Sequence, residues 1–234
     1  MRQARDLSGR GPKTRVRGPF VFEGAEMSHK FYDLTFTPSV KAAQEHYGTR
    51  RNYARFEGGE SDFYGLSDAE NDFIEARDGF YMATVNEDGQ PYIQFRGGPP
   101  GFLKVLDDRT LGYADFRGNL QYISVGNLKA NDKAALFLRD YANKARLKLL
   151  VRVEVKDAQE APEIIEKLTM PDYKAKVERA MILHVEAFDW NCPQHITPRY
   201  TIDEIRSMTA PLHEHIEKLE KEIERLKASK GSEI

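Results

Sequence analysis

Cysteine is almost missing from this sequence, and long apolar runs are missing altogether. The 234 residues include one cysteine, Cys192, which excludes an intramolecular disulfide and any zinc or iron–sulfur site built from several cysteines. No stretch of about 18 apolar residues could cross a bilayer, and the amino terminus lacks the apolar run of a secretory signal. We therefore expect a cytoplasmic protein without a membrane partner.

An excess of charge of either sign is absent as well. The formal net charge is -2 and the pI is about 6.3, so no overall field would gather nucleic acid or anionic lipid. Hydrophobic residues make up 40% and charged residues 31%, a balance typical of a globular chain. The length suits one domain with extensions, and we expect no nucleic-acid partner.

Motifs of hydrolytic and metal chemistry are also missing. The sequence shows no carboxylate pair, no Ser-His-Asp order and no histidine spacing of the metal-binding type, since His213 and His215 lie two apart on a predicted helix. The GGPPG segment at 97–101 lacks the spacing of a dinucleotide or phosphate loop and indicates a kink at a barrel corner. We expect no metal site, and we assign no catalytic residue.

The first 26 residues are rich in arginine and glycine and have no apolar stripe, which predicts a disordered tail. Its glycines and prolines would break an amphipathic targeting helix. A solvated tail, or an extension ahead of a start at Met27, is therefore favoured over an organelle leader or a nucleic-acid arm.

The remaining chain reads as strands flanked by helices. A cap at Thr37 predicts a helix over 38–46, and a capping box of Ser67 and Glu70 predicts another over 67–76. We expect strands at 80–85, 91–95, 102–106, 110–114, 134–138, 146–155 and 181–187, with helices at 119–127 and 161–168. Local strand pairs of this kind indicate a mainly β protein with an antiparallel barrel and flanking helices rather than a doubly wound parallel sheet.

Two groups of polar residues are candidates for ligand binding. Basic residues on or beside the predicted strands could hold a phosphate, because arginine grips two oxygens and lysine adds a compact charge. Solvated outward positions are the ordinary alternative. Aromatic and polar residues near 190–199 could line a binding site for a planar heterocycle, although each could equally have only a structural role. The first group consists of Arg96, Lys104, Arg117, Arg146 and Lys148. The second group consists of Trp190, Gln194, His195 and Arg199.

Three segments resemble the pyridoxamine 5'-phosphate oxidase-like FMN-binding family. They read FYMATVNEDGQPYIQFRGGPPGFLKVLDDRTLGYADFRGNLQYISVGNL, RLKLL and WNCPQHITPR, and the likeness extends over roughly 31–199. It is greatest for the flavin-nucleotide-binding subgroup. The resemblance implies that residues 27–200 form an FMN-binding split β-barrel, antiparallel and Greek-key-like, which forms a homodimer with FMN in clefts between the subunits.

The resemblance also implies which residues contact FMN. Arg96 and Lys104 would be the leading phosphate contacts, and Trp190 with Arg199 would reach the flavin of the other subunit. Arg146 and Lys148 would approach the ring. The full set of implied FMN contacts is Arg96, Lys104, Tyr113, Ala114, Arg117, Asn119, Gln121, Arg146, Lys148, Trp190 and Arg199.

One departure bears on the substrate. The oxidases carry an Arg-x-His arrangement that holds the vitamin B6 phosphate, whereas this chain reads QHITPR from Gln194 to Arg199. The resemblance therefore implies an FMN-dependent oxidoreductase whose small-molecule substrate or electron donor is unassigned, with Gln194 and His195 as candidate substrate contacts. A pyridoxamine or pyridoxine 5'-phosphate oxidase, a non-enzymatic flavin carrier or redox sensor, and a haem-binding barrel stay open.

Residues 201–234 continue beyond the usual end of the family. Thr201 and Glu204 predict a capping box, and apolar residues then recur at intervals of four and three. Two heptads are marginal alone, so we expect a C-terminal helical extension that packs or is assisted by dimerisation. The recurring residues are Leu212, Ile216, Leu219, Ile223 and Leu226.

Overall fold

The computed structural model describes residues 29–54, 56–57, 65–190 and 194–231. The predicted disordered tail, the alternative start at Met27 and the segment 191–193 with Cys192 lie outside the described residues. Contacts divide the chain into two units. The first unit contains the chain up to Asp140 together with Lys144–Gln194. The second unit contains Tyr141–Asn143 together with the chain from His195 onward.

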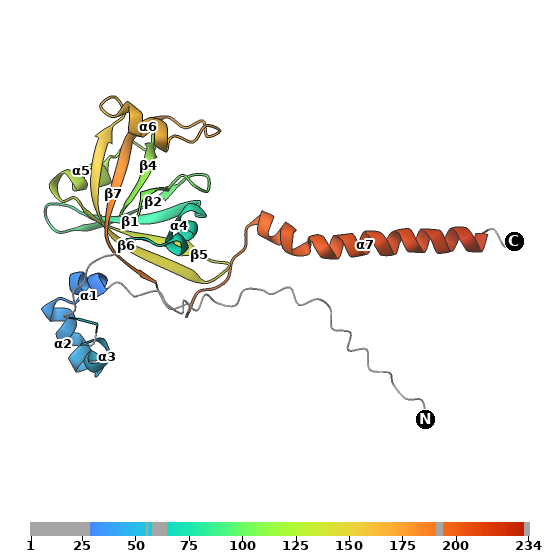
Figure 1. Ribbon diagram of the computed structural model, residues 1–234, viewed down its shortest axis with the longest axis horizontal. Helices are drawn as coiled ribbons and strands as arrows, with labels where there is room; N and C mark the ends of the chain where they lie inside the picture. The colour runs from blue at the N-terminus through green and yellow to red at the C-terminus, as the bar shows by residue number, and fades with distance from the viewer. Residues whose placement is uncertain (1–28, 55, 58–64, 191–193, 232–234) are drawn as a thin grey trace. The chain divides into compact units, whose positions relative to one another are not determined.

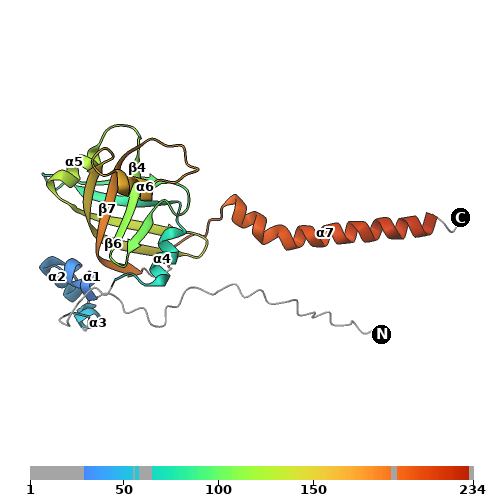
Figure 2. The ribbon, with the colours of Figure 1, turned by 45° about the horizontal axis from the view of Figure 1, so that its top comes forward.

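Seven strands form one sheet with the order β2-β1-β5-β6-β7-β4-β3, and every neighbouring pair is antiparallel. The sheet curls around itself, with helices against its outside and its open end (Figures 1 and 2). This confirms the predicted antiparallel barrel with flanking helices. The strands are β1 (Gly79–Val85), β2 (Pro91–Gly97), β3 (Lys104–Asp107), β4 (Thr110–Phe116), β5 (Lys133–Asp140), β6 (Ala145–Asp157) and β7 (Val177–Trp190).

The hairpin of β1 and β2 is set by its turn. The Asn86 side-chain oxygen accepts hydrogen bonds from the backbone N–H of Asp88 at 3.1 Å and of Gln90 at 2.8 Å. Gly89 has a φ of 81°, a left-handed conformation that glycine adopts at little cost. The strands expected at 80–85 and 91–95 are therefore present and form a hairpin with a glycine at its turn.

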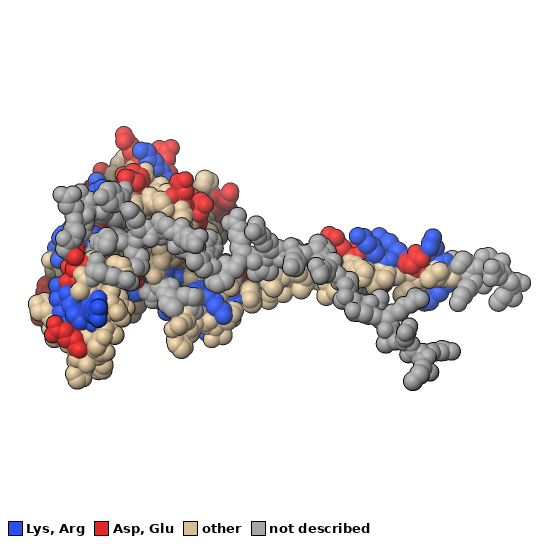
Figure 3. Space-filling view, turned by 60° about the horizontal axis from the view of Figure 1, so that its bottom comes forward, with Lys and Arg blue, Asp and Glu red and all other residues tan. Residues whose placement is uncertain are grey.

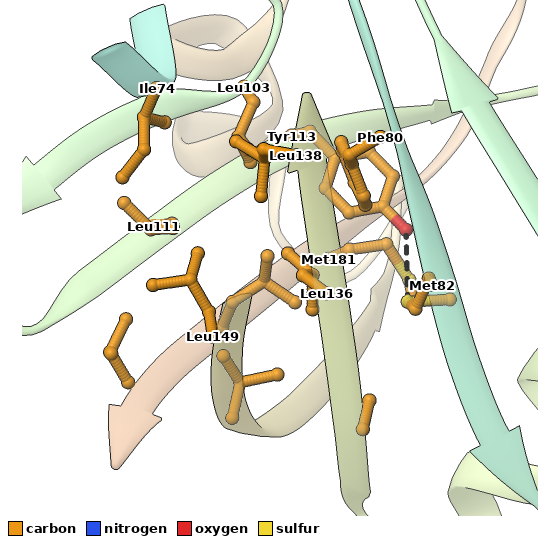
Figure 4. Packing of buried hydrophobic residues seen from close by; sticks show 14 of the residues in the cluster. Ile74, Phe80, Met82, Leu103, Leu111, Tyr113, Leu136, Leu138, Leu149 and Met181 are labelled. Carbon is orange, nitrogen blue, oxygen red and sulfur yellow. Dashed lines mark hydrogen bonds between the residues drawn. The ribbon is translucent and has the colours of Figure 1, made fainter. Parts of the chain in front are cut away.

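The barrel interior is filled by a single apolar cluster. Phe80, Phe102 and Tyr113 pack their rings together, with Phe80 and Tyr113 edge to face at 5.4 Å between centroids. Leucines and methionines from the neighbouring strands complete the interior (Figure 4). Burial of these side chains supplies most of the drive to close the sheet.

A second, smaller cluster lies on the other side of β4 and β7. There Ala114, Ala180 and Ile182 pack with Leu168 of helix α6 (Pro162–Leu168). Met181, Leu183 and Val185 alternate with Ile182 and His184, a pattern typical of a strand with one buried face, but Ile182 is only 7% exposed. The reason is that α6 covers the outer side of the strand there.

The helices before the barrel include the two that were expected. Helix α2 (Pro38–His46) begins after Thr37, whose hydroxyl oxygen accepts a hydrogen bond from the Val40 N–H at 3.4 Å. Helix α4 (Asp68–Glu75) begins with the capping box of Ser67 and Glu70. Helices α1 (His29–Thr35) and α3 (Arg50–Ala54) adjoin α2 in sequence.

The helix expected at 119–127 begins later, as α5 (Ile123–Ala130). Leu120 and Tyr122 have φ values of 62° and 53°, which a right-handed helix cannot include. Asn119 does not cap the helix, because its side-chain oxygen accepts a hydrogen bond from the Gln121 N–H at 3.2 Å within the preceding turn.

The second unit contains helix α7 (Ile202–Gly231), 30 residues long. Its predicted capping box is present: Glu204 accepts from the Thr201 N–H at 2.7 Å, and Thr201 accepts from the Glu204 N–H at 3.2 Å. Across the described ranges, no helix combines the length and apolar character that a bilayer span requires.

Candidate functional site

A polar pocket lies where the edge strand β2, the end of β4, the start of β7 and the first turn of α5 meet. Its cavity volume is about 40 Å³, well below the usual range of sites that enclose a whole small molecule. The pocket brings Arg96 together with the loop that precedes α5. Its lining residues are Gln94, Arg96, Asp115, Phe116, Gly118, Asn119, Leu120, Tyr122, Ser124, Val125, Glu178 and Arg179.

The floor of this pocket is a carboxylate held between two guanidinium groups. Asp115, whose side chain is 4% exposed, receives Arg96 Nη1 at 2.8 Å and Arg179 Nη1 at 2.6 Å on its two oxygens. Arg179 also donates to Glu178 at 2.8 Å. Burial alone would lower the pKa of Arg179, but the hydrogen bonds and charges of Asp115 and Glu178 raise it. Arg179 therefore stays cationic.

Arg96 has donor capacity beyond its ion pair. Its side chain is 14% exposed, and its buried Nε–H finds no hydrogen-bond partner among the residues that the structure describes. The strand holds the side chain in place, because Arg96 sits opposite Phe80 in the β1–β2 register. A guanidinium with one edge on Asp115 can still offer a second edge to an anion.

The loop from Arg117 to Tyr122 forms the rim. Arg117 is half exposed, with its Nε 3.7 Å from Glu178, and the Asn119 side chain donates to Gln121 at 3.2 Å. The Tyr122 ring lies against the Arg179 guanidinium, 4.9 Å from its centroid. This contact holds the left-handed loop over the arginine pair.

Other predicted site residues lie elsewhere. Lys104 Nζ donates to the Lys167 carbonyl at 2.8 Å and does not line the pocket. The Tyr113 side chain is buried in the barrel core, where its hydroxyl donates to Met82 Sδ at 3.9 Å, and burial raises its pKa. Ala114 packs in the small outer cluster.

Arg146 and Lys148 lie on the outer face of the sheet. Leu147 and Leu149 point into the barrel core, and side chains alternate along a strand. Lys148 Nζ is 3.2 Å from Asp189 and 5.7 Å from the centre of the Phe31 ring. Burial raises the pKa of Asp189, and the charge of Lys148 opposes that rise. Within one chain, these two residues are on the opposite face from Arg96.

Trp190 is anchored to helix α4 of its own chain. Its indole N–H donates to Glu70 Oε1 at 2.7 Å, and its ring meets Phe73 edge to face at 4.7 Å. Glu70 is 2% exposed, so the indole nitrogen supplies a partner that this buried carboxylate requires.

The remaining predicted residues follow Trp190. Gln194 and His195 are exposed, and His195 has a left-handed φ of 61°. In the second unit, the Arg199 guanidinium lies 5.0 Å from the centre of the Tyr141 ring.

Sequence reasoning missed Arg179, which completes the pocket floor. A signal was available, because Arg179 opens a strongly apolar strand and a charge there requires a partner. Its partner, Asp115, is 64 residues away in the chain, too far for any local pattern to indicate. Within the described ranges, no group of three or more His, Cys, Asp or Glu side chains could hold a metal ion.

Comparisons with known proteins place this geometry in context. Residues 66–189, just over half of the chain, match the family model for pyridoxamine 5'-phosphate oxidase. No curated protein matches the chain.

Several solved structures are similar to parts of the chain. HupZ of Group A Streptococcus is 20% identical, with 58% of this chain and 99% of that chain covered and a TM-score of 0.44. A Clostridium acetobutylicum protein of the pyridoxinephosphate oxidase family, related to general stress protein 26, is 20% identical, with 58% and 94% covered and a TM-score of 0.40. An FMN-binding protein of Syntrophomonas wolfei is 16% identical, with 63% and 97% covered and a TM-score of 0.38.

Proposed function

This chain belongs to the pyridoxamine 5'-phosphate oxidase family, and from that premise we propose that it is an FMN-binding oxidoreductase whose flavin site is shared by two subunits. The observation that carries the proposal is the pocket at the start of α5. It combines the buried Arg179, the partly buried Arg96 and a helix amino terminus in one small polar cavity.

The pocket suits the phosphate of FMN. Arg96 lines the pocket with its partly exposed side chain, and the first turn of α5 presents backbone N–H groups that favour an anion. Ser124 and Gln94 add polar groups, although they already bond to each other at 3.0 Å. Asp115 and Glu178 together offset the charges of Arg96 and Arg179, and Arg117 at the rim adds a third guanidinium.

A site shared by two subunits would explain why the candidate FMN contacts lie on opposite faces of the sheet. Arg96 opens onto the pocket, whereas Arg146 and Lys148 stand on the outer face, so one chain does not present both groups to the same side. If the phosphate is held by one subunit and the ring edge by another, both groups can contribute. Lys148 would place positive charge beside the ring and stabilise negative charge there.

The outer face also has the character of a subunit interface. Tyr81, Ile93 and Phe95 are 37%, 63% and 56% exposed on neighbouring strands. A broad hollow with a cavity volume of about 330 Å³ lies on the same face, lined mainly by apolar side chains such as Ala83, Ala135 and Leu150. Contiguous apolar surface of this kind marks a site of association. We propose that a second copy covers it.

FMN and the protein would have separate roles in the reaction. FMN, when bound, would supply hydride or electron transfer. The protein would bind the phosphate through Arg96, exclude water from the apolar outer face by pairing of subunits, and tune the ring through Lys148. The reacting substrate is an unassigned small molecule.

The absorbance spectrum of the purified protein, with mass measurement of any released ligand, tests the proposal. We expect flavin absorbance and the mass of FMN, at about one per chain. Anaerobic reduction by NADPH or NADH followed by substrate-dependent reoxidation would support an enzyme over a flavin carrier. A Soret band, or no affinity for added FMN, would contradict the proposal.

A further inference from the structure

Helix α7 has an apolar face that lies open to solvent. Each of its large apolar residues from 202 to 226 is between 43% and 69% exposed. Such a face is costly to leave in water when it runs the length of a helix. The residues are Ile202, Ile205, Met208, Leu212, Ile216, Leu219, Ile223 and Leu226.

The face follows a strict heptad repeat. Ile202, Thr209, Ile216 and Ile223 fall at one position of the repeat, called a, and Ile205, Leu212, Leu219 and Leu226 fall at the other, called d. β-Branched residues at a with leucine at d favour parallel two-stranded coiled coils. Thr209 is compatible with this seam, because its hydroxyl donates to the Ile205 carbonyl of its own helix at 3.0 Å.

The rest of the helix is polar. Acidic and basic side chains lie along one edge of α7, and residues of other kinds lie along the opposite edge (Figure 3). Pro211 falls at the c position, away from the seam, so the apolar face continues past it from Leu212 to Leu226.

One pair of residues that flank the seam has opposite charge. In a parallel, in-register pair, each g position lies beside the e position five residues further along the partner helix. Glu222 is at g and Lys227 is at the following e. Because the two helices are related by two-fold symmetry, the pair of Glu222 and Lys227 forms twice. Glu222 also accepts from Arg225 of its own helix at 2.7 Å, which leaves its second carboxylate oxygen for the partner.

We propose that α7 binds the α7 of a second copy of this chain as a parallel, in-register, two-stranded coiled coil. The seam from Ile202 to Leu226 gives a contact about 37 Å long, at 1.5 Å per residue. The proposal goes beyond the flavin site, since none of the residues that carry it lines the pocket.

Disulfide trapping tests both the pairing and its direction. In the full chain with Cys192→Ser, Leu219→Cys places one thiol at a d position, where two copies face each other in a parallel in-register pair. The matched control is Lys221→Cys, two residues away on the outside of the helix. In a glutathione buffer we expect at least tenfold more disulfide-linked dimer from Leu219→Cys. Equal trapping of the two variants, or none of Leu219→Cys, would overturn the proposal.

Charge exchange tests the flanking pair. Adding Glu222→Lys to the Leu219→Cys variant places like charges together and should reduce trapping about fivefold, because each exposed pair contributes a modest energy. Adding Lys227→Glu as well should restore it. A loss that the second change does not reverse would contradict the pairing of these residues.

FMN content, measured on each variant, keeps the two proposals apart. Flavin-loaded protein whose Leu219→Cys variant resists trapping would overturn the coiled coil alone. Efficient trapping supports the coiled coil whether or not FMN is bound.

Discussion

Arg96 is the residue on which the proposed phosphate contact chiefly depends, because it meets both Asp115 and the pocket. We predict that Arg96→Ala lowers FMN affinity by on the order of tenfold or more, since a charge-assisted hydrogen bond typically contributes about 1.5 to 3 kcal/mol. Riboflavin, which lacks the phosphate, should be much less affected. Fluorescence titration with both ligands measures the difference.

Lys104→Ala is the matched comparison. The resemblance makes Lys104 an equal candidate, whereas the structure places its amino group on the Lys167 carbonyl and outside the pocket. If Lys104→Ala weakens FMN binding and Arg96→Ala does not, the phosphate lies beside β3 and our placement is wrong. Equal losses for FMN and riboflavin in Arg96→Ala would show that Arg96 does not bind the phosphate.

Glu57 gives a prediction about pH. Its pKa is lowered from 4.5 to about 2, first by a hydrogen bond from Arg50 and then by one from Lys41. A lowered folded-state pKa means that the stabilisation is present above about pH 4.5 and is lost as the pH falls toward 2. Carboxyl carbon shifts measured by NMR should show this titration, and Arg50→Gln should move it back toward 4.5. A Glu57 carboxyl that already titrates near 4.5 in the unaltered protein would contradict the ion pair.

Among the elements, α4 and the end of β7 are joined through one buried carboxylate. Glu70 accepts hydrogen bonds from Ser67 and from the Trp190 indole. We predict that Glu70→Ala lowers the free energy of unfolding by about 2 to 4 kcal/mol, because it removes a cap and leaves the indole N–H unpaired. Glu70→Gln keeps an acceptor oxygen and should cost less. Urea unfolding followed by the fluorescence of Trp190, the chain's single tryptophan, measures both.

An equal loss in the two Glu70 variants would show that the charge, rather than the acceptor, stabilises this junction.

The elements with local signals were predictable from the sequence. The cap at Thr37, the capping boxes at Ser67 and Thr201, and the turn at Gly89 each depend on neighbours within four residues, and each is present. The start of α5 could not be read in this way. Tyr122 adopts a left-handed conformation that its own side chain disfavours, and its contact with Arg179 arises only once β7 is in place.

The site was predictable in part. Arg96 could be named as a phosphate candidate, but its partner Asp115 depends on the pairing of strands far apart in sequence. The outward direction of Arg146 and Lys148 was available from alternation, since Leu147 and Leu149 mark the inward face.

For the whole molecule, the apolar outer face leads to a prediction about assembly. In a Leu219→Lys background, which opens the proposed coiled coil of α7, we expect Ile93→Lys to convert the proposed dimer to a species that dissociates at micromolar concentration, because a buried charge without a partner is costly at an interface. Ile93 is preferred to Phe95, whose ring lies over Gly79 of its own chain. Gln90→Lys, at the exposed turn of the same hairpin, adds the same charge and should leave the dimer intact. Light scattering that shows an unchanged dimer in Ile93→Lys would place the interface elsewhere.

The substrate forms the second prediction at this scale. We expect the FMN-loaded protein to oxidise pyridoxamine 5'-phosphate poorly or not at all, because the oxidases' Arg-x-His arrangement is missing and Arg199 lies against Tyr141 instead. A dianionic substrate without its cationic partner would not be positioned for reaction. Pyridoxal phosphate and peroxide are followed together under oxygen. Turnover near 1 per second, within the ordinary enzyme range, would contradict this expectation.

The pairing of β4 with β7 also determines how long part of the barrel must wait for its partner strand during synthesis. Strand β4 ends at Phe116, and the strand that must cover its edge begins at Val177, roughly sixty residues later in the chain. Ribosomes add about 5 to 20 residues per second, so the nascent protein waits some 3 to 12 seconds with that edge open. An open strand edge is a template for aggregation. Cells that translate this message slowly should therefore lose more of the protein to misfolding during synthesis, before a barrel has formed to bind anything.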